Sequence, residues 1–152
     1  MVSRGLLVLL LLLASPAAAQ SVHVIDGDGL RIDGQSFRLW GIDAPELRQE
    51  CSQGGKRYTC GEVARSALET ALRGSVPRCE PVGRGRYGRT IARCYVGKDD
   101  LAAIMVRSGW AVDWPSYSRG AYADMQEAAR RENRGLWAGF FAVPWEWRKG
   151  TR

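Results

Sequence analysis

Apolar and polar side chains alternate along the segment that follows residue 20. Polar or small residues separate the apolar positions Val22, Val24, Leu30 and Ile32, and this period of two is typical of strands with one buried face. Asp33-Gly34 is a strong signal for a two-residue hairpin turn. The pattern therefore predicts two or three short strands over residues 22–42.

Helical periodicity appears in three later segments. The clearest is 62–73, where apolar residues recur at helical spacing. A second helix, capped by Asp99 or Asp100, is expected to end near Ser108. A third is expected over 121–134, where a glycine follows directly. The sequence therefore predicts three helices.

The remaining segments complete the fold class. Strands are predicted at 76–81 and 90–96, on either side of a basic turn at 83–89, and the polar, Gly-rich segment 47–61 is predicted to be an exposed loop. About five short strands with three interspersed helices indicate an α+β protein that is mainly β. An OB-type barrel and several other small α+β folds fit this pattern.

The first 19 residues have the layout of a secretory signal peptide. Arg4 supplies a positive charge, an apolar run covers 6–14, and three alanines at 17–19 offer the small residues of a cleavage site. The run is far shorter than the roughly 20 residues of a transmembrane helix. We expect 1–19 to be removed and 20–152 to form one exported domain, periplasmic or secreted, with no stable membrane association.

The charge balance favours anionic partners. The chain has 22 basic and 16 acidic residues, a formal net charge of +6, and loss of Arg4 with the leader leaves 21 against 16, or +5. Such an excess favours nucleic acids, anionic lipids or cell-wall polymers, without selecting among them.

Four cysteines in an exported chain predict two disulfides. Three pairings are formally possible. The spacing favours Cys51–Cys60 across a Gly-Gly loop and Cys79–Cys94 across the predicted hairpin. A zinc site is disfavoured because no C-x2-C pair occurs and the only histidine, His23, is remote in the sequence.

One stretch, 37–46, combines charge with apolar residues. Arg38, Asp43 and Glu46 stand in a segment that is otherwise apolar enough for a core strand. Burying an unpaired ion costs on the order of several kcal/mol, so each charge needs a partner or a metal. Strict alternation puts Arg38 and Asp43 on opposite faces. A shared site therefore requires a bulge or strand end, for which Gly41 is the natural place.

A second charged cluster is Asp26-Gly27-Asp28-Gly29. If the strand pattern continues through it, both aspartates point to the same face and repel each other. A divalent cation such as Ca²⁺, held together with Asp43, would relieve this repulsion. A hydrated Asp-Gly turn is the alternative. An EF-hand loop is excluded because Phe37 stands where the bidentate acid should be.

The third cluster surrounds Tyr87 with Arg84, Arg86 and Arg89 on a short turn. Guanidinium groups suit phosphate because they donate parallel hydrogen bonds and stay charged, and a tyrosine ring can stack on a base. A solvated basic loop is the simpler interpretation of this turn alone.

The three clusters in this order resemble the staphylococcal nuclease (thermonuclease) family, whose pattern is an Asp-Gly-Asp strand, an F-R-L-x-x-x-D-x-P-E run and a later Tyr-Gly-Arg. The resemblance extends over about 22–137. It implies a five-stranded OB-fold barrel with three helices that binds one Ca²⁺ and hydrolyses phosphodiester bonds of DNA and RNA with little sequence preference. We expect a monomer that acts on single-stranded or locally opened nucleic acid.

The resemblance also implies the metal ligands. Asp28, Asp43 and the backbone carbonyl of Ala44 match the family's Ca²⁺ ligands, with Asp26 just outside the coordination shell. Gly29 and Ala44 stand where the family archetype has threonines. Ala44 keeps the carbonyl, whereas Gly29 removes a hydroxyl near the metal, so we expect weaker Ca²⁺ binding rather than altered chemistry.

Roles toward the substrate follow from the same resemblance. Arg38 and Arg89 match the residues that contact the scissile phosphate, and Glu46 matches the base that activates water, which agrees with the charge that phosphodiester hydrolysis requires. The residues expected to bind the rest of the substrate are Arg86, Tyr87 and Tyr117.

Two other functions stay open. One is an OB-fold module that binds nucleic acid without cutting it, and the other is a disulfide-stapled envelope protein that binds another anionic polymer. The aromatic residues Trp145 and Trp147 are expected to dock the tail onto the body of the protein rather than to bind a ligand.

Overall fold

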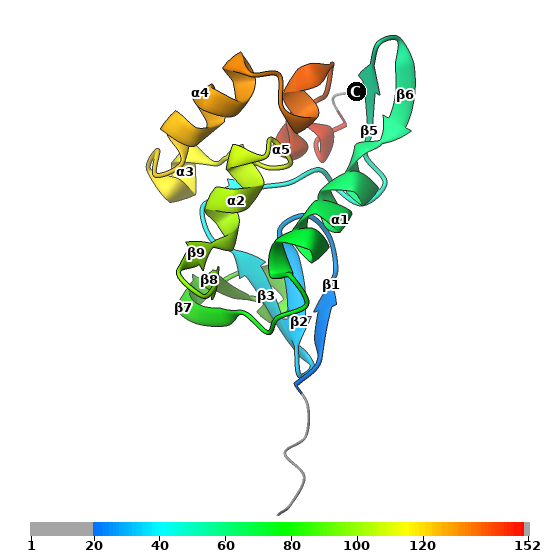
Figure 1. The fold of residues 1–152 in the computed structure, drawn as a ribbon. Coiled ribbons are helices and arrows are strands. Elements are labelled where there is room, and N and C mark those ends of the chain that lie inside the picture. Colours follow the sequence, from blue (N-terminus) through cyan, green and yellow to red (C-terminus); the bar gives the residue numbers. More distant parts are fainter. Residues whose placement is uncertain (1–19, 151–152) are drawn as a thin grey trace, which may run out of the picture.

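The computed structural model describes residues 20–150, so the predicted signal peptide at 1–19 lies outside the described residues. The main sheet is shown in Figure 1, and its strands lie side by side in the order β1, β2, β3, β8, β7. Their bounds are Val22–Val24, Gly29–Ile32, Gln35–Leu39, Thr90–Val96 and Arg78–Arg84, and β9 (Asp99–Asp100) pairs with β8. The β3–β8 pair is parallel and the other pairs are antiparallel. The α+β, mainly β class is confirmed.

The first two hairpins of this sheet confirm the predicted Asp33-Gly34 turn and show that the Asp-Gly-Asp segment forms a turn, the alternative to a continued strand. The Asp33-Gly34 turn joins β2 to β3, with Ile32 opposite Gln35. The strand pattern does not continue through the Asp-Gly-Asp segment, because β1 ends at Val24. The N–H of Asp28 donates to Asp26 Oδ1 at 3.1 Å, and this local bond stabilises a turn in place of a strand.

The three predicted helices are present with slightly different ends. They are α1 (Cys60–Leu72), α2 (Leu101–Arg107) and α4 (Ala123–Arg131). Asp100 caps α2, since its Oδ1 accepts the N–H of Ala102 at 2.9 Å. Two four-residue helices, α3 (Pro115–Ser118) and α5 (Pro144–Trp147), and two 3₁₀ turns, η1 (Arg86–Gly88) and η2 (Gly135–Ala138), were not predicted.

One hydrophobic core joins the sheet to α1 and α2. Leu30 and Leu39 enter it from the sheet, Leu68 from α1, and Met105 and Val106 from α2, and all five side chains are buried. Burial of this apolar surface is the main stabilising contribution to the fold. No helix in the described part of the chain is long and apolar enough to cross a membrane.

The prediction of an exposed loop over 47–61 was wrong. This segment contains a hairpin of β5 (Glu50–Gln53) and β6 (Lys56–Thr59), and Gln53 pairs with Lys56 around Gly54-Gly55. Both glycines have positive φ, as a two-residue turn of this kind requires. Hydrophobic periodicity does not predict this hairpin, because its strands are mostly polar and only Cys51 and Tyr58 contribute to the small apolar cluster beside it.

Both predicted disulfides are confirmed. Cys51 of β5 is bonded to Cys60 at the start of α1, with the Cα atoms 5.6 Å apart. Cys79 of β7 is bonded to its cross-strand partner Cys94 of β8, with the Cα atoms 4.0 Å apart. One bridge therefore fixes the β5–β6 hairpin, and the other fixes the β7–β8 hairpin that leads to the basic turn.

Candidate active site

Arg38 joins two buried carboxylates at one end of β3. Its Nη2 donates to Asp28 Oδ2 at 3.0 Å and to Asp43 Oδ1 at 2.6 Å. The same oxygen of Asp28 accepts the backbone N–H of Ala44 at 2.8 Å. Three of the residues implicated by sequence therefore converge, and the backbone of a fourth completes the cluster.

Strand β3 ends between Arg38 and Asp43, as predicted. Strand β3 ends at Leu39, and β4 (Ile42–Asp43) pairs with β10 (Val112–Asp113) in a separate two-stranded sheet. Gly41 lies in the intervening turn with φ of +77°, a conformation that non-glycine residues rarely adopt. The turn at Gly41 is what brings Asp43 into contact with Arg38.

The negative charges of the cluster are only partly offset. Asp28 is 3% exposed, and this burial raises its pKa to about 8 although Arg38 opposes the shift; Asp26 and Asp43 raise it further. Burial also raises the pKa of Asp43, against the contributions of Arg148 and Arg38. Burial acts to lower the pKa of Arg38, but the charges of Asp28 and Asp43 bring the net shift above its ordinary value. The cluster therefore attracts cations.

Arg148 is a member of this cluster that the sequence patterns did not reveal. It follows α5, and its guanidinium donates to both oxygens of Asp43, from Nη1 at 3.0 Å and from Nη2 at 2.8 Å. Nη1 also donates to Glu46 Oε1 at 2.7 Å. Arg148 thus ties Glu46 to the Arg38 cluster across about a hundred positions of sequence, which no local motif records.

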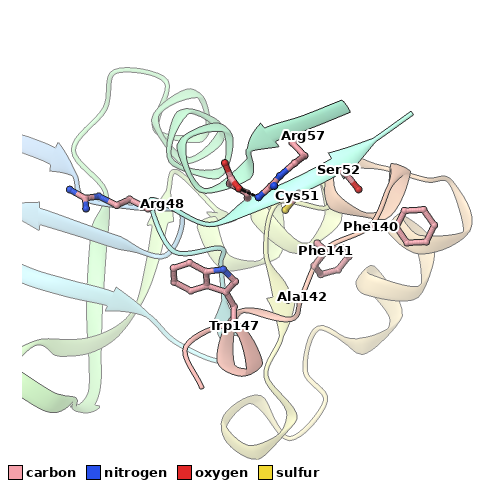
Figure 2. A pocket seen from close by; sticks show the side chains of 9 residues that line it. Arg48, Cys51, Ser52, Arg57, Phe140, Phe141, Ala142 and Trp147 are labelled. Atoms are coloured by element: carbon pink, nitrogen blue, oxygen red, sulfur yellow. Dashed lines mark hydrogen bonds and ion pairs between the residues drawn. The ribbon is translucent and has the colours of Figure 1, made fainter. Parts of the chain in front are cut away.

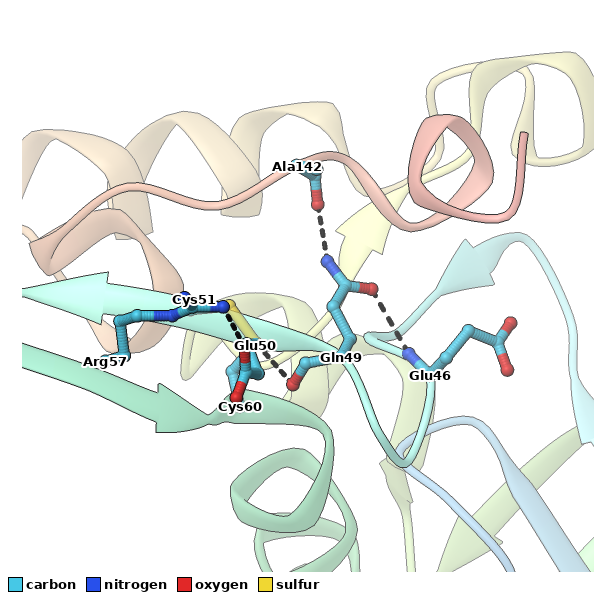
Figure 3. The surroundings of a disulfide bond; sticks show 7 residues. All are labelled: Glu46, Gln49, Glu50, Cys51, Arg57, Cys60 and Ala142. Carbon is cyan, nitrogen blue, oxygen red and sulfur yellow. Dashed lines mark hydrogen bonds and ion pairs between the residues drawn. A yellow bond between two sulfur atoms is a disulfide. The ribbon is translucent and has the colours of Figure 1, made fainter. Parts of the chain in front are cut away.

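Glu46 is also held through its backbone. The side chain of Gln49 is buried, and its Oε1 accepts the N–H of Glu46 at 3.3 Å while its Nε2 donates to the carbonyl of Ala142 at 2.7 Å. Figure 3 shows Gln49 between these two groups, next to the Cys51–Cys60 bridge. Gln49 therefore joins the segment of Glu46 to the C-terminal segment.

Arg89 lies at the beginning of β8, the strand that runs parallel to β3. Ile91 of β8 is in register with Arg38, so the alternation of a strand places Arg89 on the same face as Arg38. Its Nε is buried and has no hydrogen-bond partner among the residues described. A guanidinium with a buried, unsatisfied donor is suited to an anion.

The other residues predicted to bind substrate do not join the cluster. Arg86 and Tyr87 lie in η1, and Tyr87 is 94% exposed. Tyr117 is nearer, because its ring packs edge-on against Trp114 with the centroids 4.5 Å apart. The ring of Trp114 in turn lies 5.7 Å from the guanidinium of Arg38. Trp114 is therefore an aromatic neighbour of the cluster.

An open groove of about 700 Å³ flanks the site. Its lining includes Arg48, two positions after Glu46, and Trp147, which precedes Arg148. Figure 2 shows Arg48 at one end of the groove and Phe140 at the other. Phe140 is 83% exposed. The groove thus combines a positive charge with exposed aromatic surface.

The carboxylates suit a hard divalent cation in charge and in donor type. Asp28 and Asp43 supply carboxylate oxygens in a buried setting, and burial, with the charges of Asp26 and Asp43, raises the pKa of Asp28 against the effect of Arg38. Among residues 20–150, however, no group of three or more His, Cys, Asp or Glu side chains converges in an arrangement that could hold a metal ion. Backbone carbonyls and water would have to complete the roughly six to eight oxygens of a Ca²⁺ shell.

The chain matches a known protein family. A family model described as "Staphylococcal nuclease homologue" matches residues 36–139. The matched range includes Arg38, Asp43, Glu46 and Arg89, whereas Asp28 and Arg148 lie outside it.

Several relatives are similar over most of the chain. An "Uncharacterized endonuclease" of Escherichia coli O157:H7 is 30% identical over 134 residues, which is 84% of this chain and 82% of that protein. One of Haemophilus influenzae is 31% identical over 135 residues, 84% of this chain and 71% of that protein. The "Succinoglycan biosynthesis protein ExoI" of Rhizobium meliloti is 39% identical over 127 residues, 82% of this chain, and the match spans 66% of that protein's length.

Proposed function

Because the chain belongs to the staphylococcal nuclease homologue family and is a nuclease, we propose that it is an exported, Ca²⁺-dependent enzyme that hydrolyses phosphodiester bonds of DNA and RNA with little sequence specificity. The observation that carries this proposal is the convergence of Asp28, Arg38 and Asp43, with Glu46 joined to them through Arg148. The cluster holds three carboxylates, those of Asp28, Asp43 and Glu46, against the two guanidiniums of Arg38 and Arg148, so an excess of negative charge remains that a metal cation would offset.

The metal would be held by Asp28, Asp43 and the carbonyl of Ala44, with Asp26 outside the first shell. Ca²⁺ bound there would offset the negative charge that a phosphodiester gains in its transition state. Gly29 supports a role for Asp26, because a Cβ at position 29 would lie 2.7 Å from Asp26 Oδ1. A side chain at position 29 would therefore move the Asp26 carboxylate away.

Two arginines would act on the phosphate. Arg89 has a buried Nε without a partner in the described structure, so it can receive a phosphate oxygen without first breaking an ion pair. Arg38 lies on the same face of the sheet and is already aimed at the carboxylates. Their charges oppose the repulsion between the anionic substrate and the attacking oxygen.

Glu46 would act as the general base. It is partly exposed at the rim of the cluster, where water can reach it, and Gln49 fixes its backbone. The carboxylate would take a proton from water as the oxygen attacks phosphorus and the bond to the leaving oxygen breaks. Arg148 would have to release Glu46 Oε1 for this step.

The remaining parts of the proposal concern substrate and location. The groove with Arg48 and Phe140 suits a single strand or a locally opened duplex, because aromatic rings can stack on unpaired bases and arginine can contact phosphates. Export of residues 20–152 as one domain, periplasmic or secreted, is supported by the two disulfides, which persist in oxidising compartments. The enzyme would act as a monomer.

The test is cleavage of single-stranded DNA by the purified chain with Ca²⁺ and with a chelator. Arg89→Ala should reduce the rate by about 10²–10³-fold, the range seen for loss of one transition-state donor. Glu46→Gln should reduce it by about 10²–10⁴-fold, as expected for a general base. Arg84→Ala and Glu127→Gln remove the same charges from exposed positions outside the groove and should leave the rate nearly unchanged.

The outcomes separate the alternatives. Cleavage that survives the chelator would exclude the metal role. Arg89→Ala activity equal to that of Arg84→Ala would remove Arg89 from the site. DNA binding without any cleavage by the unmodified chain would instead favour the non-catalytic binding module.

A further inference from the structure

The C-terminal segment places a cation on the residues that the proposed reaction needs free. Arg148 pairs with both oxygens of Asp43, at 2.8 and 3.0 Å, and with Oε1 of Glu46 at 2.7 Å. Asp43 is fully buried, while the Arg148 side chain is 32% exposed. The guanidinium of Arg148 therefore pairs with Asp43, a proposed metal ligand, and with Glu46, the proposed general base.

Packing upstream fixes where Arg148 lies. Phe140 exchanges backbone hydrogen bonds with Ser52 of β5, and Gln49 holds the carbonyl of Ala142. The ring of Trp145 stacks on Trp114 with the centroids 5.8 Å apart and the planes 15° from parallel. The prediction that this aromatic pair of residues docks the tail is thus supported for Trp145. The position of Arg148 is a consequence of these contacts.

The paired guanidinium and a divalent cation cannot both be bound to Asp43 at full strength. Both Asp43 oxygens accept hydrogen bonds from Arg148, and Oδ1 also accepts one from Arg38. A Ca²⁺ ion on either oxygen would lie within a few ångströms of the Arg148 charge, and like charges at that range repel strongly in a buried site.

We propose that Arg148 is an internal counter-cation of the active site, which holds Asp43 and Glu46 in the metal-free protein and competes with the divalent cation for Asp43. The inference rests on the proposed metal role of Asp43. The Arg148 side chain is partly exposed and follows the last residue of α5, so its guanidinium can rotate toward solvent once its hydrogen bonds to Asp43 and Glu46 break. Only the fraction of molecules in which it has withdrawn binds metal well, so the apparent affinity is lowered by that fraction.

The experiment is calorimetric titration of the full chain with CaCl₂ in the absence of nucleic acid. Arg148→Met should bind Ca²⁺ about fivefold or more tightly than the unmodified chain, the lower end of typical coupling between competing sites. Arg148→Lys keeps a charge without the paired donors and should lie between the two. Lys149→Met is the matched control, because Lys149 is exposed and pairs only with Glu146, and it should change the affinity by less than about twofold.

A second measurement guards against a folding defect in Arg148→Met. The thermal midpoint of each variant is measured with and without Ca²⁺, and the rise caused by Ca²⁺ should be largest for Arg148→Met, because tighter binding stabilises the folded state more.

Each result decides between the possibilities. Equal or weaker Ca²⁺ binding by Arg148→Met, while the unmodified chain binds, overturns the competition but leaves the proposed function intact. Absence of Ca²⁺ binding in every variant overturns both. Tighter binding by Arg148→Met and Lys149→Met alike would show a general charge effect and also overturn the proposal.

Discussion

Replacing Arg38 by methionine tests whether the carboxylate cluster depends on a shared cation for stability. Arg38 is the residue that pairs with both Asp28 and Asp43, whose side chains are 5% and 0% exposed. Removing one partner of a buried ion pair costs about 3–5 kcal/mol, because the other partner is left as an uncompensated buried charge. Arg148 continues to pair with Asp43. We therefore expect Arg38→Met to lower the free energy of unfolding by about 3 kcal/mol at pH 9, the lower end of this range.

The destabilisation caused by Arg38→Met should be larger at high pH than at low pH. Burial raises the folded-state pKa of Asp28 from 3.8 to about 8. Protonated Asp28 therefore favours the folded state, and this contribution is fully present below about pH 4 and lost as the pH rises through 8. At pH 5.5 Asp28 is already largely neutral in the folded protein, so Arg38 offsets less charge there. The cost of Arg38→Met should fall by at least about 1 kcal/mol between pH 9 and pH 5.5.

The assay is urea unfolding of the oxidised protein at both pH values with a chelator present, so that no divalent cation replaces the arginine. Arg31→Met is the control, because Arg31 is exposed on the neighbouring strand and its side chain bonds only to Ser36. That variant should lose less than about 0.5 kcal/mol. A loss below about 1 kcal/mol for Arg38→Met at pH 9, or equal losses at the two pH values, would refute the reasoning.

Two further substitutions test the elements that position the site. Gly41→Ala places a Cβ at φ of +77° and 3.1 Å from atoms of Ser118 and Tyr122, so it should cost about 1–3 kcal/mol and reduce nuclease activity. Gly34→Ala is the control, because Gly34 has φ of +82° and open space around it. It should lower stability in urea unfolding but leave nuclease activity unchanged. Equal activities of Gly41→Ala and Gly34→Ala would contradict the role of Gly41. Replacing Cys79 and Cys94 together by alanine opens a bridge of sequence separation 15 and should cost about 3 kcal/mol. Reductant should then lower the unfolding midpoint of this variant less than that of the unmodified protein, and a loss below about 1 kcal/mol would count against the bridge as a stabilising element.

Local chemistry explains which parts of the fold were predictable. The Asp33-Gly34 turn, the Asp100 cap and strand 90–96 each depend on neighbouring residues, and the structure has them as predicted. The turn at Gly41 was predictable because Arg38 and Asp43 could not otherwise share a face. Strands β5 and β6 were missed because their residues are mostly polar. The Cys51–Cys60 disulfide helps to hold the hairpin against α1.

Long-range contacts explain what was missed at the site. Arg148 meets Asp43 across 105 positions, and only the docking of the tail on Trp114 brings it there. The sequence indicated that the tail docks, but docking by aromatic rings does not specify where the next side chain points. Arg86 and Tyr87 were expected to bind substrate because guanidinium groups suit phosphate and a tyrosine ring can stack on a base, and η1 places Tyr87 in solvent, away from the cluster.

The two arginines proposed to bind phosphate differ in the ion pairs that they make without substrate. This difference predicts how much each contributes to stability and to activity. Arg38 pairs with both Asp28 and Asp43, so contact with a substrate would weaken bonds that stabilise the fold. Arg89 makes no ion pair with an acidic residue of the described chain, and its buried Nε is unsatisfied. Binding a phosphate there replaces an unfavourable desolvated donor with a charge-assisted hydrogen bond. Loss of Arg89 should therefore affect activity with little effect on stability, whereas loss of Arg38 should affect both.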